Sequence, residues 1–79
     1  MPAPVRYRVV LEWDPDDKAW CVSVPAIRGC FTHGATVEEA LQNAKEAIEL
    51  NLEDMIARGE PVPSPDSVRV EEVAVQVPG

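Results

Sequence analysis

One amphipathic helix constrains the fold of this chain more than any other feature. An apolar stripe has to be covered by other parts of the protein, because an isolated helix would expose it to water. In a chain of 79 residues, that cover has to come from one small domain, for which we take the whole chain, residues 1–79. The stripe recurs at steps of three and four over about six turns, at Val37, Ala40, Leu41, Ala44, Ile48, Leu52, Met55 and Ile56.

Both ends of this helix are marked in the sequence. Thr36 stands before the stripe and Glu39 follows three positions later, the spacing of a capping box. In that motif the threonine oxygen accepts a backbone N–H of the first turn and the glutamate reaches back. At the other end, the charge of Arg58 complements the helix dipole and Gly59 can adopt the left-handed conformation. The pattern predicts a helix from Val37 to Arg58.

The residues before the helix favour three antiparallel strands. "VRYRVVLEW" places Tyr7, Val9, Leu11 and Trp13 on one face, and only Val10 breaks the alternation. "DPDD" is typical of a turn and "KAWCVSV" resumes a strand, which Pro25 ends. A short third strand is expected over "GCFTHG", residues 29–34, with Phe31 reaching a core face and the flanking Gly29 and Gly34 in turns.

A fourth strand is expected after a proline-rich connector. "EPVPSPDS" has no periodicity and predicts a stiff extended link. In "VRVEEVAVQV", Val68 and Val70 have one parity, whereas Val73, Val75 and Val77 have the other. A bulge at residue 71 or 72 would explain the change, or the strand begins at residue 72 or ends at Val70.

The expected fold class is therefore α+β with the element order β-β-β-α-β. The helix has to cross the sheet between the third and fourth strands, and such crossovers are right-handed in nearly all proteins. If the first strand is central, the fourth can pair with it in parallel, which gives a four-stranded mixed sheet of order 3-2-1-4. One helix covers one face of this sheet and leaves the other uncovered.

The charge and the termini indicate which partners and locations to expect. Fourteen acidic and seven basic residues give a formal net charge of −7, which repels nucleic-acid phosphates and attracts a basic protein. No apolar run approaches the roughly 20 residues that span a bilayer, so no membrane segment is expected. The amino terminus lacks a signal-peptide pattern, which makes the cytoplasm the expected location.

The two cysteines do not predict a metal, redox or catalytic site. Cys21 and Cys30 lack zinc and C-x-x-C spacing, and we interpret both as small buried thiols. Cys30 precedes the only histidine, His33, by three positions. Residues three apart on a strand point to opposite faces, so this pair is not expected to meet as a nucleophile and base. We predict no catalytic residue, no metal ligand and no cofactor.

Two sets of residues are candidates for binding a protein partner. The acids Glu46, Glu49 and Glu53 are spaced as a face opposite the apolar stripe, which is either merely solvated or steers a cationic partner. Trp13 and Trp20 flank the first turn. For each tryptophan, burial in the small core is the ordinary expectation. The alternative is that one is buried against the helix and the other lies on the uncovered face, where a large aromatic side chain can anchor an interface.

The run from Tyr7 to Pro65 resembles the HicB antitoxin family. The likeness lies in the ordered spacing of a Tyr-led first strand, a Val-Pro and a Gly-Cys pair, the helix start Gly-x-Thr-x-x-Glu-Ala, Glu-Ala-Ile, and a closing Pro-x-Pro. The resemblance implies a partial, degenerate RNase H-like fold. It also implies a non-enzymatic role, namely binding and inhibition of HicA toxins, which are small basic ribonucleases that cleave messenger RNA. The positions to which we assign structural roles in this pattern are Pro25, Gly29, Gly34, Thr36, Glu39 and Gly59.

Members of that family typically carry a carboxy-terminal DNA-binding module, whereas only "VRVEEVAVQVPG" follows the connector here. Autoregulation through operator DNA is therefore not expected. One alternative is a stand-alone domain that self-associates as a homo-oligomer through its uncovered face or a strand edge. Another is a residual nuclease that holds metals with Glu12, Asp14, Glu49 and Glu71, which the resemblance disfavours because the family lacks the metal site of nucleases with this fold.

Overall fold

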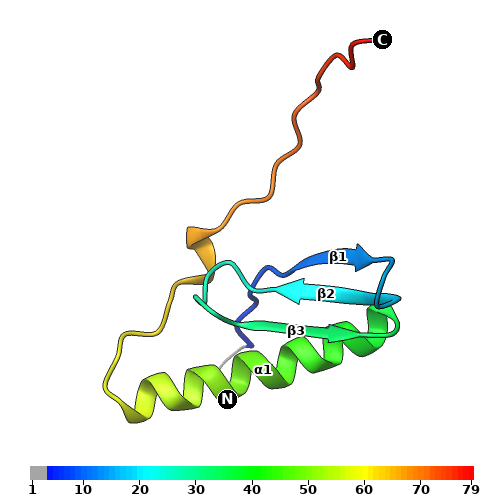
Figure 1. Cartoon of the computed structure of the whole chain (residues 1–79). Coiled ribbons are helices and arrows are strands. Elements are labelled where there is room, and N and C mark those ends of the chain that lie inside the picture. The colour runs from blue at the N-terminus through cyan, green and yellow to red at the C-terminus, as the bar shows by residue number, and fades with distance from the viewer. Residues whose placement is uncertain (1–3) are drawn as a thin grey trace.

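The computed structural model describes residues 4–79. Three short strands precede one long helix: β1 (Val10–Asp14), β2 (Ala19–Ser23), β3 (Phe31–Gly34) and α1 (Val37–Ala57). A 3-10 turn, η1 (Pro65–Ser67), forms the end of the proline-rich connector. Figure 1 shows two layers, with α1 lying across one face of the sheet and the carboxy-terminal segment leaving the body.

The three strands form an antiparallel sheet in the order β1-β2-β3. In the β1–β2 register Leu11 lies opposite Val22, and in the β2–β3 register Val22 lies opposite Thr32. Residues directly opposite each other share a face, so these three side chains lie on the face that α1 covers. The α+β class and the order of the first three strands are as predicted.

The core consists of two small clusters between the sheet and α1. Val22 packs with Ala40 and Ala44, and half-buried Leu11 and Trp20 pack against them. The second cluster contains Val24, Ile27 and Cys30, with half-buried residues of α1 and of the segment before β1 around it. Alanine on the helix allows α1 to approach the sheet closely, which explains why the sequence has small residues there.

Both predicted helix caps form, with two small differences. The Thr36 Oγ1 accepts a hydrogen bond from the Glu39 N–H at 3.1 Å, but Glu39 Oε1 accepts from Ala35 N–H at 3.4 Å. The helix ends at Ala57, one residue earlier than predicted, and Arg58 is the C-cap. Gly59, with a φ of +72°, and Glu60 donate backbone N–H groups to the Ile56 and Met55 carbonyl oxygens at 3.1 and 2.9 Å, the pattern of a Schellman motif.

The third strand is shorter than predicted and exposes its aromatic residue. Gly29, with a φ of +77°, lies in the turn, and β3 begins only at Phe31. Phe31 is 72% exposed, so the prediction that it reaches a core face is wrong. The reason is the pleat: Cys30 and Thr32 occupy the helix side, and the residue between them has to point away.

The expected fourth strand does not form within this chain. Residues 68–79 carry no regular secondary structure, and Figure 1 shows them running away from the sheet. The longest dimension of the molecule is 53 Å, against 27 and 24 Å for the others. Its radius of gyration is 15.1 Å, compared with about 12 Å for a compact chain of this length. The sheet therefore has the order 3-2-1, and among residues 4–79 no strand pairs with the outer edge of β1.

The connector is nevertheless held next to the segment that leads into β1. The Tyr7 hydroxyl donates a hydrogen bond to the Pro63 carbonyl oxygen at 2.7 Å. The Arg8 Nη1 donates to the carbonyl oxygens of Pro65 and Val68, at 3.2 and 2.8 Å. These contacts bring the start of the carboxy-terminal segment to the β1 side of the body, where the sequence predicted a fourth strand.

Within residues 4–79, α1 is too polar to cross a bilayer, and no other helix is long enough to do so.

Candidate partner-binding surface

The acidic residues predicted to bind a partner lie together on the outer side of α1. Glu46, Glu49 and Glu53 are all exposed. Steps of three and four place them on the side opposite buried Ala40 and Ala44. The whole helix with its C-cap carries six acidic and two basic residues. This acidic ridge, defined by the three glutamates, is one patch of negative potential.

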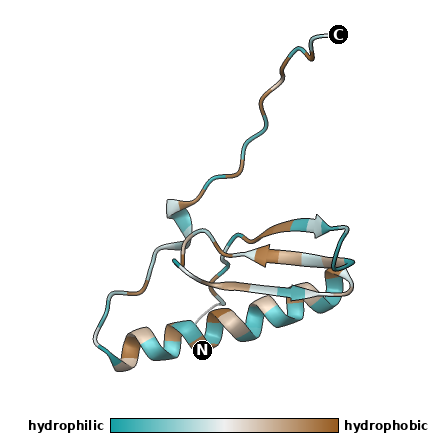
Figure 2. Cartoon of the chain, viewed as in Figure 1, coloured by the Kyte–Doolittle hydropathy of each residue, from teal (hydrophilic) through white to brown (hydrophobic). Residues whose placement is uncertain are grey.

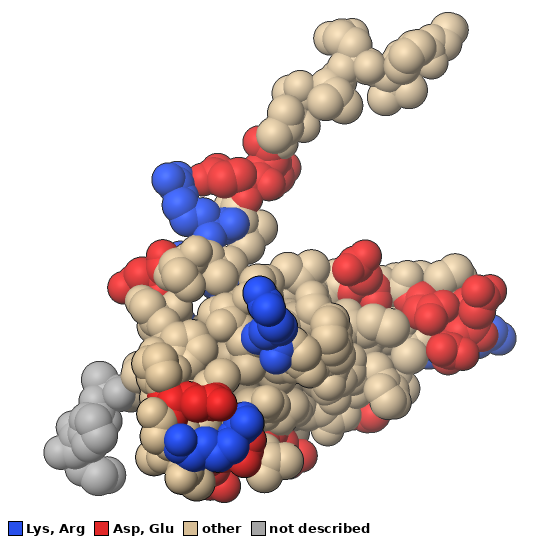
Figure 3. All heavy atoms as spheres, turned by 60° about the vertical axis from the view of Figure 1, so that its left-hand side comes forward, with Lys and Arg blue, Asp and Glu red and all other residues tan. Residues whose placement is uncertain are grey.

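A second acidic region lies at the end of the molecule formed by the β1–β2 turn, as Figure 3 shows. Asp14 has a structural role in this turn, because its Oδ1 accepts hydrogen bonds from the backbone N–H groups of Asp16 and Asp17, at 3.0 and 3.3 Å. Asp16 and Asp17 themselves are exposed. The Asp14 side chain therefore orders the turn, and the exposed carboxylates of Asp16 and Asp17 give it a negative charge.

The two tryptophans share one face of the sheet, which rules out the alternative that they lie on different faces. Trp13 and Trp20 are directly opposite residues of β1 and β2. Trp20 is half-buried and packs against the Val22 cluster, whereas Trp13 is 48% exposed at the margin. The turn spans only residues 15–18, which fixes this register and places both rings on the helix side.

The predicted partner-binding residues therefore form two patches. Trp20 covers the first half of α1 at Ala40 and Ala44. Glu49 follows Ala40 by nine positions, which corresponds to about 14 Å along the helix axis. A partner that contacts both the acidic ridge and exposed Trp13 has to span this length of the helix.

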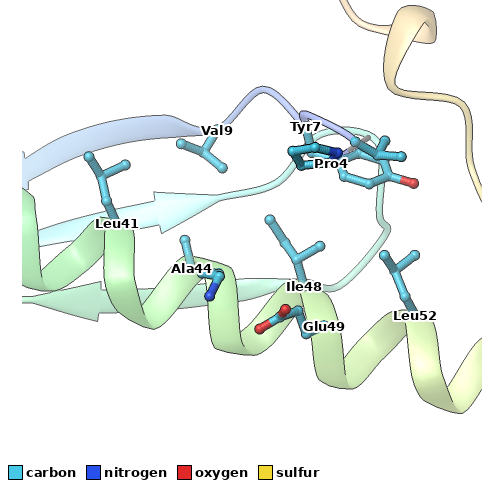
Figure 4. Close-up of a pocket in the computed structure, with 10 residues that line it drawn as sticks. Pro4, Tyr7, Val9, Leu41, Ala44, Ile48, Glu49 and Leu52 are labelled. Atoms are coloured by element: carbon cyan, nitrogen blue, oxygen red, sulfur yellow. The ribbon is translucent and has the colours of Figure 1, made fainter. Parts of the chain in front are cut away.

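An apolar groove lies beside the acidic ridge, with Glu49 of the ridge in its lining, and it was not predicted from the sequence. It has a volume of about 460 Å³ and lies between α1 and the segment before β1. Figure 4 shows Leu41, Ala44, Ile48 and Leu52 pointing from the helix toward this segment. The width of the apolar stripe on the helix could have indicated this groove. A small sheet that covers Ala40 and Ala44 cannot also cover Leu41 and Leu52. The groove is lined by Pro4, Val5, Tyr7, Val9, Leu41, Ala44, Lys45, Ile48, Glu49 and Leu52.

Cys30 and His33 lie on opposite sides of the sheet, as predicted. Cys30 is buried, and the Asn51 Nδ2 lies 3.6 Å from its Sγ in donor geometry. Burial raises the pKa of the Cys30 thiol, which disfavours the nucleophilic thiolate. His33 is exposed opposite Cys21. Cys21 is exposed as well, so the prediction of two buried thiols is wrong for this residue, which has the parity of the uncovered face.

The structure does not bring together the four carboxylates considered for a nuclease site. Glu12 lies opposite Cys21 on the uncovered face of the sheet, whereas Glu49 is on α1 at the other face. Glu71, in the carboxy-terminal segment, forms an exposed ion pair with Arg69 at 2.6 Å. Among residues 4–79, no three His, Cys, Asp or Glu side chains are close enough to hold a metal ion together.

Comparison with known proteins relates the chain to one bacterial family. Residues 7–77 match the model described as a HicB-like antitoxin of bacterial toxin-antitoxin systems. A UPF0150 protein of Synechocystis sp. is 45% identical over 65 residues, which cover 80% of this chain and 78% of the relative. A UPF0150 protein of Thermoplasma acidophilum is 42% identical over 59 residues, covering 75% and 84%. No solved structure matches the chain significantly.

Proposed function

Because this chain belongs to the HicB-like antitoxin family, we propose that it binds and inhibits a HicA-type toxin, a small basic ribonuclease that cleaves messenger RNA. Family membership supports an antitoxin role, and the identity of the toxin is our inference. The chain acts by covering the toxin surface that would otherwise hold RNA, and it contributes no chemistry of its own.

The observation that carries this proposal is the acidic ridge of α1. A ribonuclease that binds RNA phosphates presents a basic surface, and Glu46, Glu49 and Glu53 present three adjacent exposed carboxylates. The net charge of −7 adds a long-range attraction. Such complementarity raises the association rate and suppresses wrong partners more than it raises affinity, so apolar contacts have to slow dissociation. Trp13, exposed beside the hairpin turn, is our candidate for such a contact.

We also place the domain with partial, degenerate RNase H-like folds. The β-β-β-α order and the antiparallel sheet with one covering helix support this placement. In this proposal the fold serves as a scaffold for binding, with its carboxylates on surfaces that meet a protein partner.

The test uses a HicA-like protein encoded beside this chain in the same genome. The two proteins are co-expressed and co-purified, and ribonuclease activity is measured with increasing amounts of this chain. We expect a complex and stoichiometric loss of cleavage. Absence of a complex at micromolar concentrations, or a complex that still cleaves RNA at the full rate, would overturn the proposal.

A matched pair of variants tests the acidic ridge itself. The variant Glu46→Gln/Glu49→Gln/Glu53→Gln should slow association by roughly tenfold or more at low salt and flatten the dependence of the association rate on salt. The control Glu12→Gln/Asp16→Asn/Asp17→Asn removes the same charge from the sheet and the turn, and should have the smaller effect. Equal effects of the two variants would mean that only net charge matters and would remove the ridge from the proposal.

A specific observation also favours the second candidate function, self-association. The valines of the carboxy-terminal segment are exposed to solvent in the single chain. A chain this short gains much of its buried surface by pairing with another copy. Self-association through the carboxy-terminal valines uses other residues than the acidic ridge, except that Glu49 of the ridge also lines the apolar groove.

A further inference from the structure

The outer edge of β1 is an incomplete part of the sheet. β1 pairs only with β2, so alternate backbone N–H and C=O groups along its other side lack a strand partner among the described residues. Proteins usually cover or blunt such an edge, because it pairs readily with any other strand. Next to this edge lies the apolar groove, where Leu41 and Ile48 of α1 are open to a further layer of side chains (Figure 4).

The carboxy-terminal segment has the properties of the strand that this edge lacks. It is extended, and Figure 2 shows apolar and polar residues alternating along it. Val73, Val75 and Val77 have one parity and are 81%, 74% and 86% exposed. Ten residues of strand span about 33 Å, more than the length of β1. An extended segment with valines along one face has the pattern of a strand that buries that face against a sheet and a core.

The start of this segment is fixed in a direction away from its own sheet. Ser64 caps η1 through a hydrogen bond from the Asp66 N–H at 3.2 Å. Arg8 then holds the Pro65 and Val68 carbonyl oxygens. Beyond Val68 the segment projects from the body into solvent (Figure 1). The η1 turn and the hydrogen bonds from Arg8 therefore direct the valines away from their own sheet, where another molecule can reach them.

The charges of the segment before β1 are opposite in sign to the two glutamates of the carboxy-terminal segment, whereas β1 itself carries Glu12 and Asp14. The segment that leads into β1 carries exposed Arg6 and Arg8, whereas the carboxy-terminal segment carries exposed Glu71 and Glu72. A glutamate beside the valine face can meet an arginine of another copy at the sheet edge. Opposite charges on neighbouring strands stabilise pairing, and like charges would oppose it.

We propose that residues 68–77 of one copy add as a fourth strand to the β1 edge of a second copy, and that the second copy returns its own segment to the first. Val73, Val75 and Val77 then cover the apolar groove of the partner copy. This exchange is reciprocal, so it closes as a symmetric dimer and leaves neither β1 edge free. It completes the sheet order 3-2-1-4 with a strand from the other chain.

The test is sedimentation equilibrium of the full chain from low to high micromolar concentration. We expect a dimer. The variant Val73→Glu/Val75→Glu places two charges in the groove of each partner and should weaken dimerisation roughly a hundredfold. The control Ala74→Glu/Gln76→Glu adds the same charge on the opposite face of the same strand and should leave the dimer almost unchanged.

Hydrogen exchange separates exchange between copies from docking within one chain. Amides of residues 72–77 should become protected as the dimer forms, with a concentration dependence that follows sedimentation. Three results would overturn the proposal: a chain that stays monomeric, protection that does not depend on concentration, or a dimer that both glutamate variants leave intact. No toxin is present in these measurements, so their failure is independent of the proposed inhibition.

Discussion

Trp13 of β1 and Trp20 of β2 lie directly opposite each other, with ring centroids 5.5 Å apart and ring planes at 61°. This edge-to-face pair sits at the end of the sheet, one residue before the strands meet the turn. Aromatic pairs in this geometry contribute beyond the area they bury. The pair therefore stabilises the hairpin while leaving part of Trp13 available to a partner.

The two tryptophans should differ in their contribution to stability. Trp20→Ala removes a ring that packs on the Val22 cluster and should cost about 2–4 kcal/mol of the free energy of unfolding. Trp13→Ala removes a ring that is half exposed and should cost about 1–2 kcal/mol. Urea denaturation of both variants and the double variant checks this. A coupling energy of zero between the two positions would contradict the pair as a stabilising contact.

Gly34 should tolerate no side chain, because it lies against the first turn of α1. A Cβ at this position would be 2.7 Å from the Ala40 Cα and 2.9 Å from the Glu39 carbonyl carbon, and backbone cannot move aside cheaply. Gly34→Ala should destabilise the protein by about 2–3 kcal/mol. Gly59→Ala is the control: its φ of +72° strains alanine, but nothing lies within 4 Å, so the cost should be about 1 kcal/mol. Equal costs would argue against a tight contact between β3 and α1.

The helix cap should contribute a measurable part of the stability. Thr36→Ala leaves the Glu39 N–H without its acceptor and should cost about 1 kcal/mol in thermal or urea unfolding. Thr36→Ser retains the hydroxyl and should cost much less. A full loss in the serine variant would mean that the threonine methyl group, not the cap, carries the effect.

The two thiols should react at very different rates. Cys21 is exposed, whereas Cys30 is buried and its pKa is raised by burial. A thiol reagent at neutral pH should therefore modify Cys21 rapidly and Cys30 only on unfolding. Cys21→Ser should abolish the fast phase alone, and a fast phase that persists in this variant would contradict the burial of Cys30.

The same pKa shift predicts how stability depends on pH. The folded protein holds the Cys30 proton more tightly than the unfolded chain does. Its contribution to stability is therefore complete below the ordinary thiol pKa of 9.0 and is lost as the pH rises above it. Urea unfolding from pH 7 upward should show this loss in the native protein and not in Cys30→Ala. A profile that is identical in both would assign the alkaline loss to other groups.

What the sequence predicted well depends on short-range interactions. The helix start at Thr36 and the Gly59 terminus are set by residues within one turn, and both formed as expected. The parity of Leu11 was also correct, because a strand alternates regardless of its neighbours. The α+β arrangement follows from these elements.

What the sequence did not predict depends on how distant segments meet. The shared face of Trp13 and Trp20 follows from the strand register, which the length of the hairpin turn sets. The exposure of Phe31 follows from the placement of Cys30 in the core. The valines after residue 72 show the pattern of a strand. Such a pattern predicts that one face is buried, but it does not indicate which molecule covers that face.

The hydrogen bond from Tyr7 to the Pro63 carbonyl joins positions 56 residues apart. It holds the segment before β1 next to the connector after α1, so the two ends of the folded body lie close together. A circular permutant that begins in the β1–β2 turn and links these two segments would contain the same sheet, helix and core contacts. The fold therefore does not depend on the order of its elements along the chain. The permutant would also change the sequence distance between the contacting residues of the sheet and α1, on which the folding rate depends.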